Sequence, residues 1–148
     1  MATSPDLLSA CPLFSGFTAT GLKILAQIGR ERSVPAGMTV FLAGTTGESL
    51  LIVATGEVEI FSGEGEELKV LCTLGPGAHF GELALLRAST RAVSARAKGA
   101  TQLVEIRRSD FNLLLKKKPQ ACFKLMLAVF GVVADRLQSI QADLITHV

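Results

Sequence analysis

The residues that decide the fold, Gly75–Ala97, read GPGAHFGELALLRASTRAVSARA. This composition predicts a glycine turn, a short helix that begins near Gly81 and Glu82, and a strand that carries Arg91. Backbone N–H groups in the first turn of a helix have no partner within the helix and lie at the positive end of its dipole. The segment therefore predicts a turn that can hold a phosphate.

Two charged side chains add to the chemistry of this turn. Arg91 lies nine residues beyond Glu82 and can fold back to offer a two-pronged guanidinium to a phosphate. Glu82 lies at the start of the helix, where a carboxylate is favoured. Its carboxylate can also accept a hydrogen bond from the hydroxyl of a sugar. A phosphate, a hydroxyl and an apolar wall together describe a nucleotide. By spacing alone, a capped turn with a solvated arginine is the better interpretation, because a glycine turn followed by a helix and an exposed arginine is common.

The turn lies inside a β-rich region that covers residues 31–108. Short apolar runs alternate there with glycines, as in VPAGMTVFLAG, ESLLIVATGEVEIFSG and LKVLCTLGPG. Residues 57–60 alternate charged and apolar side chains as a half-buried strand does, and residues 63–65 read as the tip of its hairpin. Many short strands with glycine turns predict an antiparallel, jelly-roll-like β-roll.

Residues 4–30, before the roll, form a predicted helical entry segment. Ser4 with Pro5 can start a short turn, and Thr18 precedes a segment with one apolar face. That face consists of Leu22, Leu25 and Ile28. The fold class that we predict is therefore α+β, in one domain of residues 1–148.

Residues 109–145, after the roll, form the predicted C-terminal helices. Ser109 is a plausible N-cap for a helix over residues 110–115, and Pro119 can begin the next helix. The second helix runs almost to the end of the chain, over about 25 residues or about 37 Å.

A heptad pattern marks this long helix, with apolar residues at alternating spacings of three and four. We expect its early part to pack on the roll and its later part to need cover from another chain, because the helix outruns so small a domain. The pattern therefore predicts a homodimer through the C-terminal helix, with a monomer as the alternative. This heptad stripe comprises Phe123, Met126, Phe130, Val133, Leu137, Ile140 and Leu144.

Composition excludes several classes of protein. The chain has 148 residues with 49% hydrophobic residues and a formal net charge of +2. So small a charge, without Trp or Tyr, argues against a nucleic acid as partner. The longest apolar run, residues 125–134, is too short for a membrane span of about 20 residues. No leader peptide is recognisable at the N-terminus, so we expect no membrane partner and a cytoplasmic location.

The reactive side chains argue against catalysis and metal binding. Cys11, Cys72 and Cys122 lack a CxxC spacing, and we expect them to be reduced thiols. The two histidines, His79 and His147, cannot supply the ligands that a zinc or iron site needs, so we expect no metal and no cofactor. No nucleophile with a neighbouring base is recognisable, and we expect no enzyme.

The string FGELALL at residues 80–86, followed after four residues by Arg91 and Ala92, resembles the phosphate-binding cassette of the cyclic nucleotide-binding domains. The cyclic AMP receptor protein and the regulatory subunits of protein kinase A carry such domains. In this chain the cassette covers residues 80–97. The resemblance extends over nearly the whole chain and implies a β-roll that holds the ligand. It also includes Gly44, Gly47, residues 56–58, residues 75–77 and the long C-terminal helix.

The resemblance implies a role for each cassette residue. Arg91 would neutralise the cyclic phosphate, Glu82 would bind the ribose 2′-hydroxyl, and the amides of Gly81 and Ala84 would support both. Ala92 stands where members that prefer cyclic GMP carry Thr, which favours cyclic AMP over cyclic GMP. The expected ligand-binding residues are Phe80, Gly81, Glu82, Leu83, Ala84, Arg91, Ala92 and Arg136.

Other positions depart from the family pattern or leave alternatives open. Thr90 replaces a frequent Pro, Leu51 a common aromatic, and His79 an aromatic that often precedes Phe80. We interpret His79 as a satisfied residue at the edge of the roll. Arg136 is the candidate for contact with the base, although a solvated helix cation explains it equally well.

Two functions compete. The first is a cyclic nucleotide sensor that signals through its C-terminal helix, in a stand-alone domain without a helix-turn-helix, with an unidentified protein as a further partner. The second is a ligand-free roll that serves dimerisation or protein interaction. An inward-facing pair, Glu82 and Arg91, favours the first, because packing alone gives no reason to bury charge.

Overall fold

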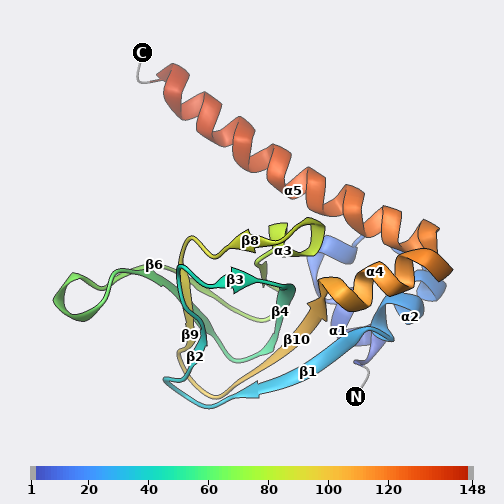
Figure 1. Ribbon diagram of the computed structural model, residues 1–148, viewed down its shortest axis with the longest axis horizontal. Coiled ribbons are helices and arrows are strands. Elements are labelled where there is room, and N and C mark those ends of the chain that lie inside the picture. The colour runs from blue at the N-terminus through green and yellow to red at the C-terminus, as the bar shows by residue number, and fades with distance from the viewer. Residues whose placement is uncertain (1–2, 147–148) are drawn as a thin grey trace.

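Two four-stranded antiparallel sheets form the centre of the molecule, and a two-stranded ladder joins them (Figure 1). The computed structural model describes residues 3–146. The first sheet has the order β1 (Gly29–Val34), β10 (Thr101–Arg107), β4 (Ser49–Thr55) and β7 (His79–Phe80), and the second β2 (Thr39–Phe41), β9 (Ser94–Ala97), β5 (Val58–Ser62) and β6 (Lys69–Leu74). The ladder pairs β3 (Thr46–Gly47) with β8 (Ser89–Thr90). The predicted antiparallel roll is confirmed.

Strand β4 is buried on both of its faces. Leu50 and Ile52 belong to the apolar cluster beneath the helices, whereas Leu51 and Val53 belong to the cluster inside the roll. Successive side chains of a strand point to opposite faces, so a strand between two cores needs apolar residues at every position. This position between two cores explains why residues 50–54 form an unbroken apolar run.

Helices cover the outer face of the first sheet (Figure 1). The side chains of Ser4 and Thr18 cap the first two helices, as predicted. The second helix ends earlier than predicted, and Ile28 lies outside it because β1 already begins at Gly29. The helical segments are α1 (Pro5–Ser9), the 3-10 turn η1 (Pro12–Phe14), α2 (Ala19–Ala26), α3 (Leu83–Leu86), α4 (Arg108–Lys117) and α5 (Pro119–Thr146). A second 3-10 turn, η2 (Gly65–Glu67), lies in the hairpin between β5 and β6.

The start of α4 differs from the prediction. The N-cap is Arg107, without a side-chain capping bond, so the predicted cap at Ser109 is wrong. The chain passes directly from β10 into the helix because Arg108 is anchored there. Its backbone N–H donates to the Glu48 carbonyl at 2.8 Å, and its guanidinium donates to the Ala84 carbonyl at 3.0 Å.

Helix α5 begins at Pro119, as predicted, and has two apolar faces. Cys122, Leu125 and Val129 are fully buried against the helical core. Phe123 is 59% exposed, so the expectation that the early heptad stripe packs on the roll is wrong for this residue. Phe130, farther along the stripe, is 56% exposed. The pitch of 3.6 residues per turn directs Cys122, Leu125 and Val129 inward instead.

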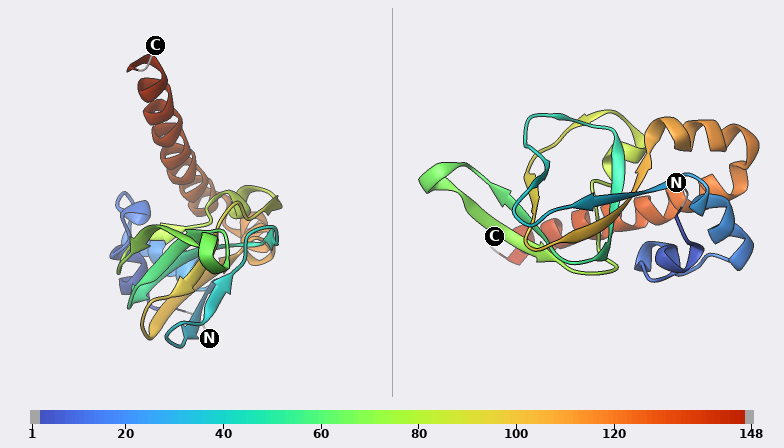
Figure 2. Two further views of the ribbon diagram at one scale, coloured as in Figure 1. Left: turned by 90° about the vertical axis from the view of Figure 1, so that its left-hand side faces the viewer. Right: turned by 90° about the horizontal axis from the view of Figure 1, so that it is seen from below.

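The second half of α5 extends away from the domain. Every residue from 134 to 145 is exposed, and Figure 2 shows this part of the helix projecting beyond the roll. The later heptad residues Leu137, Ile140 and Leu144 are therefore uncovered, as predicted. No helix within residues 3–146 is both long and apolar enough to span a lipid bilayer.

The three cysteines are free thiols, as predicted. Cys11 and Cys122 are buried, and burial raises the pKa of the Cys122 thiol to about 11. Cys72 is exposed on β6. The two buried thiols therefore act as small apolar side chains of the core.

Gly56 and Gly44 allow a test of how tightly the roll is packed. Both adopt a left-handed backbone, but a Cβ on Gly56 would lie 2.5 Å from the Ala100 carbonyl oxygen, whereas a Cβ on Gly44 meets nothing within 4 Å. We expect Gly44→Ala to lower the free energy of unfolding by about 1 kcal/mol, and Gly56→Ala by at least about twice as much. Urea unfolding of both variants measures this difference, and equal losses would contradict the close approach.

Candidate functional site

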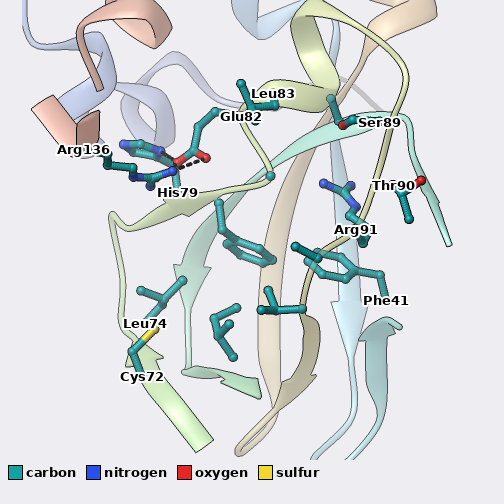
Figure 3. Close-up of a pocket in the computed structure, with 16 residues that line it drawn as sticks. Phe41, Cys72, Leu74, His79, Glu82, Leu83, Ser89, Thr90, Arg91 and Arg136 are labelled. Atoms are coloured by element: carbon teal, nitrogen blue, oxygen red, sulfur yellow. Dashed lines mark hydrogen bonds and ion pairs between the residues drawn. The ribbon is translucent and has the colours of Figure 1, made fainter. Parts of the chain in front are cut away.

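A cavity of about 350 Å³ opens beside α3 and the loop that joins β8 to β9. Figure 3 shows the side chains that line it. All eight residues that the sequence analysis predicts for a ligand site, from Phe80 through Arg136, lie in the wall of this one cavity. Its size falls in the usual range for sites that hold a small organic ligand.

Arg91 enters the cavity between two glycines. A Cβ on Gly47 would lie 2.8 Å from the guanidinium carbon, and a Cβ on Gly81 would overlap a guanidinium nitrogen. Gly81 also has a φ of +74°, a conformation that side chains other than glycine rarely adopt. The turn at Gly81 therefore makes room for the arginine, which folds back over it as predicted.

The guanidinium is oriented by its neighbours. One nitrogen donates to the Ser49 carbonyl at 2.9 Å, and the guanidinium carbon lies 4.3 Å from the centre of the Phe41 ring. The Arg91 backbone is held by Thr45 and Gly44 of the β2–β3 connection, at 2.8 and 2.9 Å. Arg91 thus lies in the bend between β8 and β9, so the predicted strand around it is interrupted.

No carboxylate within residues 3–146 forms a salt bridge with Arg91. Burial lowers the pKa of its guanidinium, although the more distant charges of Glu105 and Glu82 oppose this shift. A half-buried cation without an anionic partner is costly. The position therefore suits an incoming anion.

Glu82 lies on the other side of the cavity and is paired (Figure 3). The residue is only 3% exposed. Its carboxylate lies 2.6 Å from Nδ1 of His79 and accepts a two-pronged contact from Arg136 of α5, at 3.0 and 3.2 Å. Burial alone raises the pKa of Glu82, but the hydrogen bonds from His79, from its own backbone and from Arg136 together hold that pKa below its usual value.

Comparison with known proteins identifies the family. The sequence profile of the cyclic nucleotide-binding domain matches residues 31–118, which span the roll and the first C-terminal helix. The chain belongs to the cyclic nucleotide-binding domain family. The family is one of regulatory domains.

Related domains of this family occur in proteins of different kinds. The cyclic AMP receptor protein of Thermus thermophilus is 32% identical over 93% of the chain, and a cyclic nucleotide-gated potassium channel of Mesorhizobium japonicum is 31% identical over 78%. The chain spans 61% of the receptor and 31% of the channel. The regulatory domain of Toxoplasma gondii PKA, solved with cAMP, has a TM-score of 0.65 and 31% identity over 74% of the chain and 42% of that domain's chain.

Three residues of the site make contacts that the sequence analysis did not predict. The Ala84 amide donates to the Gly81 carbonyl at 3.2 Å, so it is already bonded within the first turn of α3. Arg136 contacts Glu82 rather than standing free as a base contact. His79 lies on the edge strand β7, as predicted, but its hydrogen-bond partner is Glu82 in the centre of the site.

Several wall residues were not predicted from the sequence. Phe41 comes from β2, and the apolar end of the cavity is formed by Ile60, Cys72 and Leu74 of the β5–β6 hairpin. The Ser49 carbonyl of β4, which orients Arg91, was not predicted either. Strand alternation is the only sequence signal for the side chains. No signal marks the Ser49 carbonyl, since every residue has one.

The described chain, residues 3–146, contains no cluster of three or more His, Cys, Asp or Glu residues arranged for a metal ion. His147 lies outside the described residues.

The lowered pKa of Glu82 predicts a pH dependence of stability. A carboxyl group whose folded pKa lies below its unfolded value, near 4.5, stabilises the fold above that pH and loses this effect as the pH falls through the folded pKa. We expect the difference in unfolding free energy between wild type and Glu82→Gln to be largest near pH 7 and to shrink below about pH 4.5.

Urea unfolding from pH 3 to pH 7 measures this difference. Glu66→Gln removes the same charge from an exposed loop, and its effect should stay within about 0.5 kcal/mol. If the difference in unfolding free energy between wild type and Glu82→Gln is constant over this pH range, the lowered pKa of Glu82 is contradicted.

Proposed function

We propose that this domain binds a cyclic nucleotide, with cyclic AMP preferred, in the cavity between Arg91 and Glu82, and that it acts as a regulatory sensor without catalysis. The observation that carries the proposal is the half-buried guanidinium of Arg91, which points into the cavity without a carboxylate partner among residues 3–146. A phosphate would supply the missing negative charge and accept the guanidinium fork.

The other walls fit the remaining parts of such a ligand. Glu82 offers carboxylate oxygens to a ribose hydroxyl on the far side of the cavity from Arg91 (Figure 3). Ile60, Leu74 and Cys72 offer an apolar surface on which a base can lie. Ala92 lines the cavity without a hydroxyl for the guanine edge, which supports the preference for cyclic AMP.

Helix α5 is the proposed output element, because it reaches the cavity directly. Arg136 is the α5 residue in the cavity wall, and its guanidinium holds the carboxylate that the ribose hydroxyl would approach. The Arg136 side chain is 59% exposed, so its contact with Glu82 is the more easily rearranged. A ribose hydroxyl that competes with Arg136 for Glu82 would weaken the contact that holds α5. The contact would then differ between the free and the bound domain, and this difference would couple ligand binding to the position of α5.

The exposed part of the heptad stripe supports a parallel homodimer through α5. Phe123, Phe130, Leu137, Ile140 and Leu144 are each more than half exposed. A continuous apolar stripe of this length favours a helix partner, and the heptad spacing fits a second copy of the same helix. Ligand binding would then alter the pairing of two helices, while an unidentified protein remains a further partner and the cytoplasm the predicted location.

Arg91→Ala tests the binding site. We expect the variant to bind cyclic AMP more weakly by about 3 kcal/mol, or roughly 100-fold, because a phosphate in the cavity loses its ionic partner. Isothermal calorimetry measures the affinity. Arg87→Ala is the matched control, because Arg87 is an exposed cation just after α3 and outside the cavity wall. Equal binding of cyclic AMP by wild type and Arg91→Ala would show that the assignment of Arg91 to the phosphate is wrong, whereas binding by neither protein would favour the ligand-free roll.

Replacing Leu137 and Ile140 together by Asp tests the dimer. We expect monomers, because two carboxylates in an apolar seam cannot ionise cheaply. For the wild type, cyclic AMP should change the dimer dissociation constant by a factor of about 5 to 150. Light scattering and analytical ultracentrifugation, with and without cyclic AMP, measure both effects.

The control for this test is the pair Gln138→Asp and Ser139→Asp, which adds the same charge to exposed positions of α5 beside the stripe. This variant should remain dimeric. A wild type that is monomeric with and without cyclic AMP would contradict the homodimer.

A further inference from the structure

His79 contacts the central carboxylate of the site from a strand, and the family resemblance assigns it no role. On β7 it pairs with Ile52 of β4, while Phe80 pairs with Leu51. Because neighbouring strand residues point to opposite faces, Phe80 enters the roll core and His79 faces the helices, as Ile52 does. The left-handed turn at Gly81 then brings Glu82 back onto the imidazole.

The protonation of this contact follows from chemistry. The lowered pKa of Glu82 means that its carboxylate is ionised at neutral pH and can only accept hydrogen bonds. Nδ1 of His79 must therefore carry the proton and donate it across the 2.6 Å to Oε1. A donor that bonds an ionised acceptor makes one of the stronger hydrogen bonds in proteins.

His79 and Arg136 differ in how firmly they are held. The His79 side chain is 15% exposed and stands on a strand of the central sheet, whereas the Arg136 side chain is 59% exposed on the projecting part of α5. Oε1 accepts from both residues, and Oε2 accepts from Arg136. If α5 rearranges as proposed, His79 is the partner that stays and keeps Oε1 in place.

We infer that His79 is a positioning residue for ribose recognition: it fixes one oxygen of Glu82 on the sheet, so that the other is presented to the ligand's 2′-hydroxyl whether or not Arg136 remains bound. The inference rests on the proposed function and deepens it. It makes the discrimination between a ribose ligand and its 2′-deoxy analogue depend on a histidine, at a position where the family often carries another aromatic residue.

The test compares two ligands in four proteins. Calorimetry measures the affinities of wild type, His79→Phe, His79→Leu and His79→Asn for cyclic AMP and for 2′-deoxy cyclic AMP. Phe and Leu remove the donor, and Leu serves as the second variant should Phe fail to fold. Asn keeps an N–H near the position of Nδ1. Thermal unfolding checks that each variant is folded.

We expect wild type to prefer cyclic AMP over the deoxy analogue by about 10-fold or more, the effect of one hydrogen bond to a charged group. His79→Phe and His79→Leu should bind cyclic AMP about 10-fold more weakly, bind the deoxy analogue with unchanged affinity, and so lose the preference. His79→Asn should recover most of it.

Three results would overturn the inference. Equal weakening of both ligands in His79→Phe and His79→Leu would show that His79 only supports the shape of the cavity. Unchanged affinities for both ligands in these variants would show that Glu82 is positioned without it. Wild type that binds neither nucleotide would overturn the proposed function as well, and is thereby distinguished from the first two results.

Discussion

The structure of the site depends on the desolvation of one guanidinium. Arg91 is held over Phe41 and against the Ser49 carbonyl, and its position leaves no room for a side chain at Gly47 or Gly81. These contacts orient the cation but do not neutralise it. A folded domain that keeps such a group half-buried gains stability when an anion binds, since a ligand that binds only the folded state shifts the equilibrium toward it.

The two charged side chains of the cavity differ in their bonding partners. Arg91 has no carboxylate partner within the described residues 3–146, whereas Glu82 bonds His79 on the sheet and Arg136 on α5. Arg108 adds a second link, because its guanidinium bonds the carbonyl of Ala84 in the cassette helix while its backbone begins α4. The cassette is therefore connected to both C-terminal helices, and a ligand that bridges Arg91 and Glu82 would act on those connections.

The predictions that were wrong share one cause. Ser109 has the right residue type for an N-cap, and Phe123 has the right spacing for a buried stripe, but each prediction used only the local sequence pattern. The anchoring of Arg108 on Glu48 starts α4 earlier, and the position of the core selects a different face of α5. The local sequence pattern indicates which residues can be buried, and the tertiary contacts determine which of them are buried.

The sequence by itself determined the β-roll, the cassette and the start of the long helix at Pro119, because glycine turns, strand alternation and proline act over a few neighbouring residues. It also determined that Arg91 and Glu82 face one site, through the resemblance of residues 80–92. Only the tertiary structure decided that Arg91 has no carboxylate partner among residues 3–146, while Glu82 contacts both His79 and Arg136. The physical reason is that these groups come from separate elements, and their distances depend on how a strand, a short helix and the projecting α5 pack together.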